Sequence, residues 1–155
     1  HLYPLYILLF GMPGIPSVYY GSEWGIEGAR EPDSDAPLRP SMEEVARRPA
    51  GDEALFSLLS RLAGLRKEYQ ALQNGSYREL LVEHQQLAFL RESDADQVVV
   101  AVNASEEEVA LELPIPDSEG VFVDLLNGTG ERHVVDGTLR CTVLPRWGAL
   151  LGRRR

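Results

Sequence analysis

The chain has 155 residues, 44% of them apolar, and a formal net charge of −9 at pH 7. This length allows one domain or two small ones, and the apolar share suffices for a packed core. The acidic balance argues against a nucleic-acid partner, because phosphate binding needs a clustered basic surface. The single cysteine, Cys141, excludes an internal disulfide, and its alternating apolar neighbours predict a small buried side chain.

Residues 1–20 are almost wholly apolar and predict a helix over 2–10 followed by a strand over 15–20. The strand has consecutive bulky residues without polar alternation, which is typical of a strand buried on both faces in a parallel sheet. Prolines and glycines interrupt any continuous membrane span, and no basic signal-peptide segment precedes the apolar run. We therefore predict no membrane partner.

Such an apolar segment should not open a free-standing protein, so we interpret the chain as a piece of a larger one. Its uncovered apolar face predicts a homo-oligomer in solution with residues 2–20 at the contact.

Residues 21–51 predict a long loop rich in Gly, Pro, Asp and Arg, of a length that is usually functional or disordered. Asp52 can cap a helix whose leucines repeat at three and four residues as far as Leu72. Asn74-Gly75 predicts its end. Arg66 falls on the apolar side and should find a partner or reach past its neighbours.

Residues 76–155 alternate short β-prone runs with turn residues, which predicts an antiparallel β-sandwich. Phe89 and Phe122 are predicted core residues, and the histidines have no metal-ligand spacing. We predict neither a metal site nor a cofactor. The runs are 77–83, 87–91, 97–103, 108–113, 121–125, 133–135, 138–143 and 149–151.

Three Asn-x-Ser/Thr triplets match the glycosylation acceptor pattern. They begin at Asn74, Asn103 and Asn127, and the first and last are Asn-Gly pairs, which are primarily turn signals.

The run Gly14–Glu23 resembles the last barrel strand of the alpha-amylase family of glycoside hydrolases. The stretch Gly25–Met42 is similar to the substrate-side loop that follows it, and the helix from Asp52 resembles the eighth barrel helix. The blocks Val98–Asn103 and Leu144–Leu151 resemble the C-terminal β-sandwich. Among the branches of this family, the sequence resembles the cyclomaltodextrinase, neopullulanase and maltogenic amylase group.

The fold class that this resemblance implies is an α+β fragment with two parts. Residues 1–75 would hold the last strand and helices of a (β/α)8 TIM barrel, and residues 76–155 the antiparallel β-sandwich.

The resemblance also implies a parent enzyme that hydrolyses α-glucosidic bonds of maltodextrins or cyclodextrins with retention. That reaction needs a carboxylate nucleophile and a carboxylic acid about 5 Å apart. The family carries these groups on barrel strands with no match here, so we expect no catalytic residue and no activity from this chain alone. The lone thiol fits a reducing compartment, and a cytoplasmic location is expected.

Three loop residues are predicted to contact the α-glucan. Arg39 can donate in a fork to sugar hydroxyls, or it can tether the loop through a salt bridge. Trp24 can stack on a sugar ring or fill the gap beneath the loop. Glu31 stands in the substrate-side loop where the family has Asp before Pro. Glu23, an acid at the strand's end, is interpreted as structural.

Two other functions remain open. The sandwich could be a non-catalytic carbohydrate-binding or interaction module, although its aromatic residues are few. Alternatively, the parent could be an α-glucan transferase or a trehalose synthase, which share the barrel.

Overall fold

The computed structural model describes residues 2–47, 51–116 and 119–155. The chain divides into two compact units, one of His1–Pro16 with Arg61–Arg155 and one of Ser17–Ser60.

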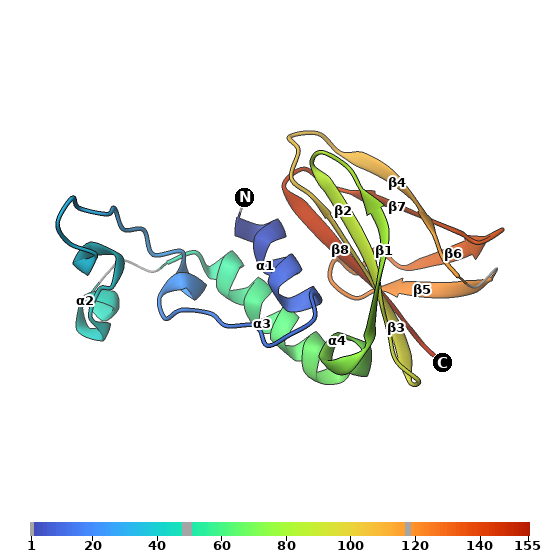
Figure 1. Ribbon diagram of the computed structural model, residues 1–155, viewed down its shortest axis with the longest axis horizontal. Coiled ribbons are helices and arrows are strands. Elements are labelled where there is room, and N and C mark those ends of the chain that lie inside the picture. The colour runs from blue at the N-terminus through green and yellow to red at the C-terminus, as the bar shows by residue number, and fades with distance from the viewer. Residues whose placement is uncertain (1, 48–50, 117–118) are drawn as a thin grey trace. The chain divides into compact units, whose positions relative to one another are not determined.

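The larger unit is built around eight antiparallel strands, and each predicted strand is confirmed to within a few residues (Figure 1). Hydrogen-bonded neighbours follow the order β1-β2-β3-β8-β5-β6-β7-β4. The strands are β1 (Ser76–Val82), β2 (Gln86–Glu92), β3 (Asp96–Asn103), β4 (Val109–Pro114), β5 (Gly120–Asp124), β6 (Glu131–Val135), β7 (Thr138–Val143) and β8 (Trp147–Arg154).

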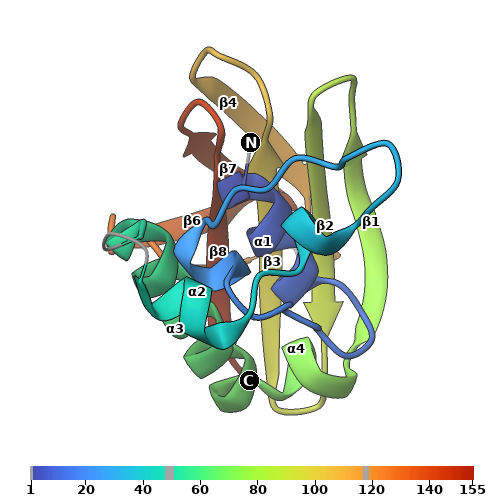
Figure 2. The same cartoon turned by 90° about the vertical axis from the view of Figure 1, so that its left-hand side faces the viewer.

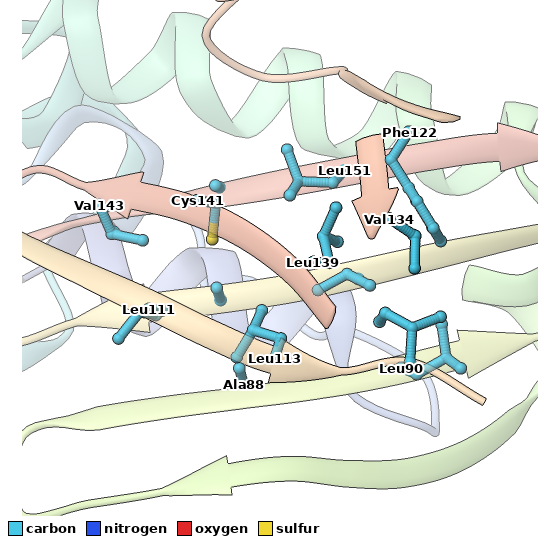
Figure 3. Close-up of a cluster of buried hydrophobic side chains, with 14 residues drawn as sticks. Ala88, Leu90, Leu111, Leu113, Phe122, Val134, Leu139, Cys141, Val143 and Leu151 are labelled. Atoms are coloured by element: carbon cyan, nitrogen blue, oxygen red, sulfur yellow. The ribbon is translucent and has the colours of Figure 1, made fainter. Parts of the chain in front are cut away.

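The strands enclose one apolar core, to which each strand from β2 to β8 contributes side chains (Figure 3). Phe122 and Leu139 are fully buried in it, and Phe89 is fully buried on the sheet. Both phenylalanines are therefore core residues, as predicted. The alternation of apolar residues specifies the core because every second side chain in a strand faces the same side.

Cys141 lies in this core as a free thiol. Desolvation raises the pKa of Cys141 to about 11, with Arg132 opposing the shift and Asp124 adding to it. We expect a thiol reagent such as DTNB to label the denatured chain rapidly and the folded chain hardly at all in mildly alkaline buffer. Fast labelling of the folded chain would contradict the buried position, and a Cys141→Ala variant gives the background.

The same thiol couples stability to pH. Its folded pKa exceeds the unfolded value of about 8.5, so the folded state holds the proton more tightly. The contribution to stability is present below that unfolded value and is lost as the pH rises towards about 11.

A helical layer covers the opposite face of the sheet. Helix α1 (Leu2–Gly11) confirms the first predicted helix and lies against β3 and β8 (Figure 2). Every residue of β3 is consequently buried. The approach is close at two glycines: a Cβ on Gly11 would lie 2.9 Å from Val100 Cγ1, and one on Gly148 would lie 2.9 Å from Ile7 Cδ1.

The single helix predicted after Asp52 is two helices, α3 (Glu53–Glu68) and α4 (Gln70–Asn74). Asp52 caps the first, since its Oδ1 accepts from Leu55 N at 3.0 Å. The chain breaks at Tyr69, which is extended with φ −101° and ψ 116°.

Gly75 ends α4 as predicted, but its φ of −65° is not left-handed. Glycine is needed there for space, because a Cβ would lie 2.5 Å from Ala71 O and 2.6 Å from Glu92 O.

The predicted strand over residues 15–20 is wrong. These residues form no strand, and Ile15 is 95% exposed. A strand exists only where a neighbour completes its hydrogen bonds, and the described part of this chain offers none. The barrel part of the predicted fold is accordingly not seen in this chain. Among the described helices, none combines the length and the apolar character required to cross a membrane.

Two buried arginines hold the end of α1. Arg66 donates from Nη1 to Phe10 O at 2.6 Å and to Met12 O at 3.2 Å, and also bonds Gly14 O. Arg91 donates to Gly11 O at 2.7 Å. Of the two outcomes predicted for Arg66, the structure shows the one in which it finds hydrogen-bond partners.

Candidate functional site

The unit of residues 17–60 contains all three predicted sugar-contacting residues. Its first turn is made by two left-handed glycines, Gly21 (φ 86°) and Gly25 (φ 64°), around η1 (Ser22–Trp24). Ile26 N closes the turn on Gly21 O at 3.1 Å. Glu23, in η1, is half-buried, and its Oε2 is shielded without a hydrogen-bond partner among the described residues.

Trp24 packs against α3. Its ring is stacked on that of Phe56, with centroids 4.3 Å apart and planes 8° from parallel. Trp24 O also accepts from Asp52 N at 3.1 Å. These contacts tie the turn to the start of α3, in line with the gap-filling alternative. Stacking of a sugar on this half-buried ring stays a prediction.

Glu31 lies in a tight turn on the surface. It forms a β-bridge with Ser34, whose O accepts from Glu31 N at 3.2 Å. An ion pair between Arg30 Nε and Asp35 Oδ1 at 3.2 Å closes the same turn. The Glu31 carboxylate is therefore exposed on a closed turn. Across the described ranges, no group of three or more His, Cys, Asp or Glu could hold a metal ion.

Arg39 is exposed and follows η2 (Ala36–Leu38), where Arg39 N donates to Ala36 O at 2.9 Å. No ion pair of Arg39 is present in the described part of the chain, so a tether through a salt bridge is not seen there. Its guanidinium is accessible to a ligand. No hydrogen bond, ion pair or ring contact among the described residues joins Trp24, Glu31 and Arg39 to one another.

A hollow of about 160 Å³ lies beside Arg39, and none of the three predicted residues lines it. Tyr19, Tyr20, Gly28 and Pro37 are among its walls. The Tyr20 hydroxyl donates to Pro40 O at 2.7 Å, which fixes one wall. The pKa of Tyr20 is raised, first by a hydrogen bond with the Tyr19 side chain and then by desolvation.

Sequence reasoning missed both this hollow and helix α2 (Met42–Arg47). The apolar run over residues 15–20 predicts a strand at both tyrosines, which hides their place in a hollow. The helix had a usable signal, since Ser41 and Glu44 form a capping box. Ser41 N donates to Glu44 Oε2 at 2.6 Å and Glu44 N to Ser41 Oγ at 3.2 Å.

Comparison with known proteins identifies relatives along nearly the whole chain. Residues 77–149 match the family described as maltogenic amylase, C-terminal domain. The chain is 27% identical to a cyclomaltodextrinase of Geobacillus thermopakistaniensis over 95% of its length and 24% of that protein. It is 32% identical to neopullulanase 2 of Thermoactinomyces vulgaris, over 92% of its length and 24% of that protein. The chain therefore spans about a quarter of the length of these relatives.

Solved structures show the same fold. A Geobacillus thermoleovorans alpha-amylase, complexed with acarbose, superposes with a TM-score of 0.78 at 19% identity, over 98% of this chain and 34% of that one. An Anoxybacillus alpha-amylase superposes with a TM-score of 0.76 at 22% identity, over 94% of this chain and 30% of that one.

Proposed function

We propose that this chain, whose residues 77–149 match the maltogenic amylase C-terminal domain family, is part of an alpha-amylase-family enzyme that hydrolyses α-glucans. The substrates would be maltodextrins or cyclodextrins. One observation carries the proposal: similarity to the cyclomaltodextrinase and the neopullulanase covers 92–95% of the chain. It thus includes the loop unit as well as the sandwich.

The test compares this chain with the full-length gene product on a chromogenic maltoside and on cyclodextrin. We expect the 155-residue chain to show no turnover above buffer, because retaining hydrolysis needs two carboxylates that the family resemblance assigns to other strands. The full-length product should be active. Turnover by the chain alone would overturn the first expectation, and a full-length product inactive on every α-glucan would overturn the proposed function.

The sandwich gives little support to the alternative that it is a carbohydrate-binding module. Such modules present exposed aromatic rings, whereas Phe89 and Phe122 are fully buried here. Tyr77 is exposed but leans on Phe89, with ring centroids 5.0 Å apart. Retardation of the isolated chain in a starch gel would favour this alternative.

A transferase parent has some support in sequence. The chain is 34% identical to a cyclomaltodextrin glucanotransferase of Klebsiella oxytoca, over 73% of its length and 17% of that protein. Product analysis of the full-length protein distinguishes a transferase from a hydrolase. A transferase forms new glucosidic bonds, whereas a hydrolase releases only shortened sugars.

Arg39 supplies the sharpest test of the loop's role. In the full-length enzyme we expect Arg39→Ala to raise KM about tenfold, because one charge-assisted hydrogen bond to a sugar hydroxyl is lost. Arg30→Ala is the matched control: Arg30 is exposed in the same loop but paired with Asp35. Equal kinetics for Arg39→Ala and the parent enzyme would remove Arg39 from the binding site.

Self-association through residues 2–20 and a cytoplasmic location remain proposals. The inner face of α1 is covered by the chain's own sheet. The apolar residues that stay exposed in the segment are Leu2, Leu5, Met12, Ile15, Tyr19 and Tyr20.

A further inference from the structure

The two Asn-Gly pairs of the chain have different surroundings. We propose that Asn127-Gly128 is a site of spontaneous deamidation. In this reaction the Gly128 backbone nitrogen attacks the side-chain carbonyl carbon of Asn127. The inference is independent of the proposed glycosidase function, since it concerns the turn after β5.

The neighbours of the Asn127 amide fix its orientation. Its Oδ1 accepts from Trp147 Nε1 at 2.6 Å. Its Nδ2 lies 3.3 Å from Asp124 Oδ2 and 3.3 Å from Gly148 O, both of which can only accept. The reversed orientation would set the amide oxygen against two acceptors and the amide nitrogen against an N–H donor, so only one orientation satisfies all three partners.

This arrangement activates the carbonyl. Negative charge develops on Oδ1 when a nucleophile adds to the amide carbon, and the Trp147 N–H already points at that oxygen. A fixed donor at a developing oxyanion lowers the barrier to addition, as it does in acyl transfer. The leaving nitrogen is the one beside the Asp124 carboxylate.

The nucleophile is unhindered. Gly128 is exposed, has φ +66°, and a Cβ built on it would meet nothing within 4 Å. Its N–H has no hydrogen-bond acceptor among the described residues. Glycine has no side chain to obstruct the attack, and its backbone moves more freely than that of any other residue.

The other candidates lack these features. At Asn74-Gly75 the glycine N–H is bound to Ala71 O at 3.0 Å, and Gly75 O accepts from Arg91 Nη2 at 3.0 Å. Asn103 is fully buried and followed by Ala104 rather than glycine.

The chemistry balances with water as the only co-reactant. The N–Cγ bond forms, the Cγ–Nδ2 bond breaks, and the proton from Gly128 N leaves with ammonia by way of water. Water then opens the cyclic imide to aspartate or isoaspartate. Either product replaces a donor with a carboxylate close to Asp124, and like charges at that spacing repel. The turn between β5 and β6 should therefore loosen with age.

The test follows both Asn-Gly pairs in one folded chain by peptide mass mapping during incubation in mildly alkaline buffer. We expect Asn127 to convert roughly tenfold faster than Asn74 in the folded chain, and the two rates to converge in denaturant. Equal folded rates, or a faster Asn74, would overturn the proposal, and this comparison needs no variant.

Two variants then test whether the hydrogen bond from Trp147 activates the Asn127 carbonyl or restrains the side chain. Trp147→Phe, checked for folding by circular dichroism, should slow conversion of Asn127 roughly tenfold because the donor to Oδ1 is lost. Acceleration would show that the hydrogen bond restrains the side chain, which would also overturn the proposal. Asn127→Gln should give no conversion at this position and serves as the control.

Discussion

Replacing Arg91 with methionine is expected to lower the free energy of unfolding by about 3–5 kcal/mol, because more than one backbone carbonyl loses its donor at a cost of about 1–3 kcal/mol for each buried group. The Arg91 side chain is 1% exposed. Its guanidinium donates to four backbone carbonyls. They are Gly11 O (2.7 Å), Gly75 O (3.0 Å), Ser76 O (3.1 Å) and Leu72 O (3.4 Å).

The loss is large because two of the contacts, those to Gly11 O and Leu72 O, are buried, and these oxygens lose their Arg91 donor. Methionine fills much of the volume but donates nothing, so the unsatisfied acceptors cost their desolvation free energy. Desolvation, and then the nearby charge of Arg66, lower the pKa of Arg91. The charge is offset by the carbonyl end of α1, where a cation is favoured.

Urea denaturation followed by circular dichroism measures the effect as a shift in midpoint at constant slope. Arg78→Met is the matched control, since Arg78 is an exposed arginine on the neighbouring strand β1. The control should stay within about 0.5 kcal/mol of the parent. An Arg91→Met chain as stable as the control would show that the carbonyls find other donors.

The sandwich was predictable because its signals are local. Period-two alternation identifies each strand, and the turn residues between them have distinctive backbone requirements. Asp136 and Gly137 illustrate this with φ values of 49° and 73°, the paired left-handed conformation of a tight hairpin. Neither signal depends on which strands become neighbours in space.

The strand prediction for residues 15–20 failed because its signal depends on neighbouring strands rather than on local sequence. Its apolar run is typical of a strand buried between parallel neighbours, but burial requires those neighbours to be present. The exposure of Ile15 shows how a correct residue pattern yields no strand without a partner.

Some features of the candidate site could likewise be predicted from the sequence, and others could not. Exposed polar residues such as Arg39 and Glu31 could be placed on a loop from composition alone. The Tyr19–Tyr20 hollow could not, since it depends on the return of the loop to Pro40, 20 residues after Tyr20.

The break between α3 and α4 has its cause far away in sequence, at Asp96, and leads to the second large prediction. Asp96 is fully buried at the start of β3. Its Oδ1 accepts from Ala71 N at 2.7 Å and its Oδ2 from Gln70 N at 3.0 Å, so it caps α4 from 25 residues away. Continuing α3 through Tyr69 would direct these two N–H groups into the helix and leave the carboxylate with fewer donors.

A cation completes the Asp96 site. Arg154 Nη1 lies 3.1 Å from Asp96 Oδ2, and its guanidinium stands 4.2 Å from the centre of the Tyr69 ring. The last strand thereby contacts both the capping carboxylate and the residue at which the helix breaks. The half-exposed side chain of Arg154 limits what the ion pair itself contributes.

We expect Asp96→Ala to lower the free energy of unfolding by about 3 kcal/mol. The substitution removes the cap of α4 and leaves the buried donors that bind Asp96 without an acceptor. Asp96→Asn should lose less, because one side-chain oxygen can still accept from α4. Amide hydrogen exchange at Gln70 and Ala71 reports the cap directly, and it should accelerate more than exchange in β8. Asp94→Ala, an exposed aspartate in the same turn, should leave both stability and exchange unchanged. Unchanged exchange at Gln70 and Ala71 in Asp96→Ala would mean that packing against β2 and β3, rather than the distant carboxylate, sets where the helix breaks.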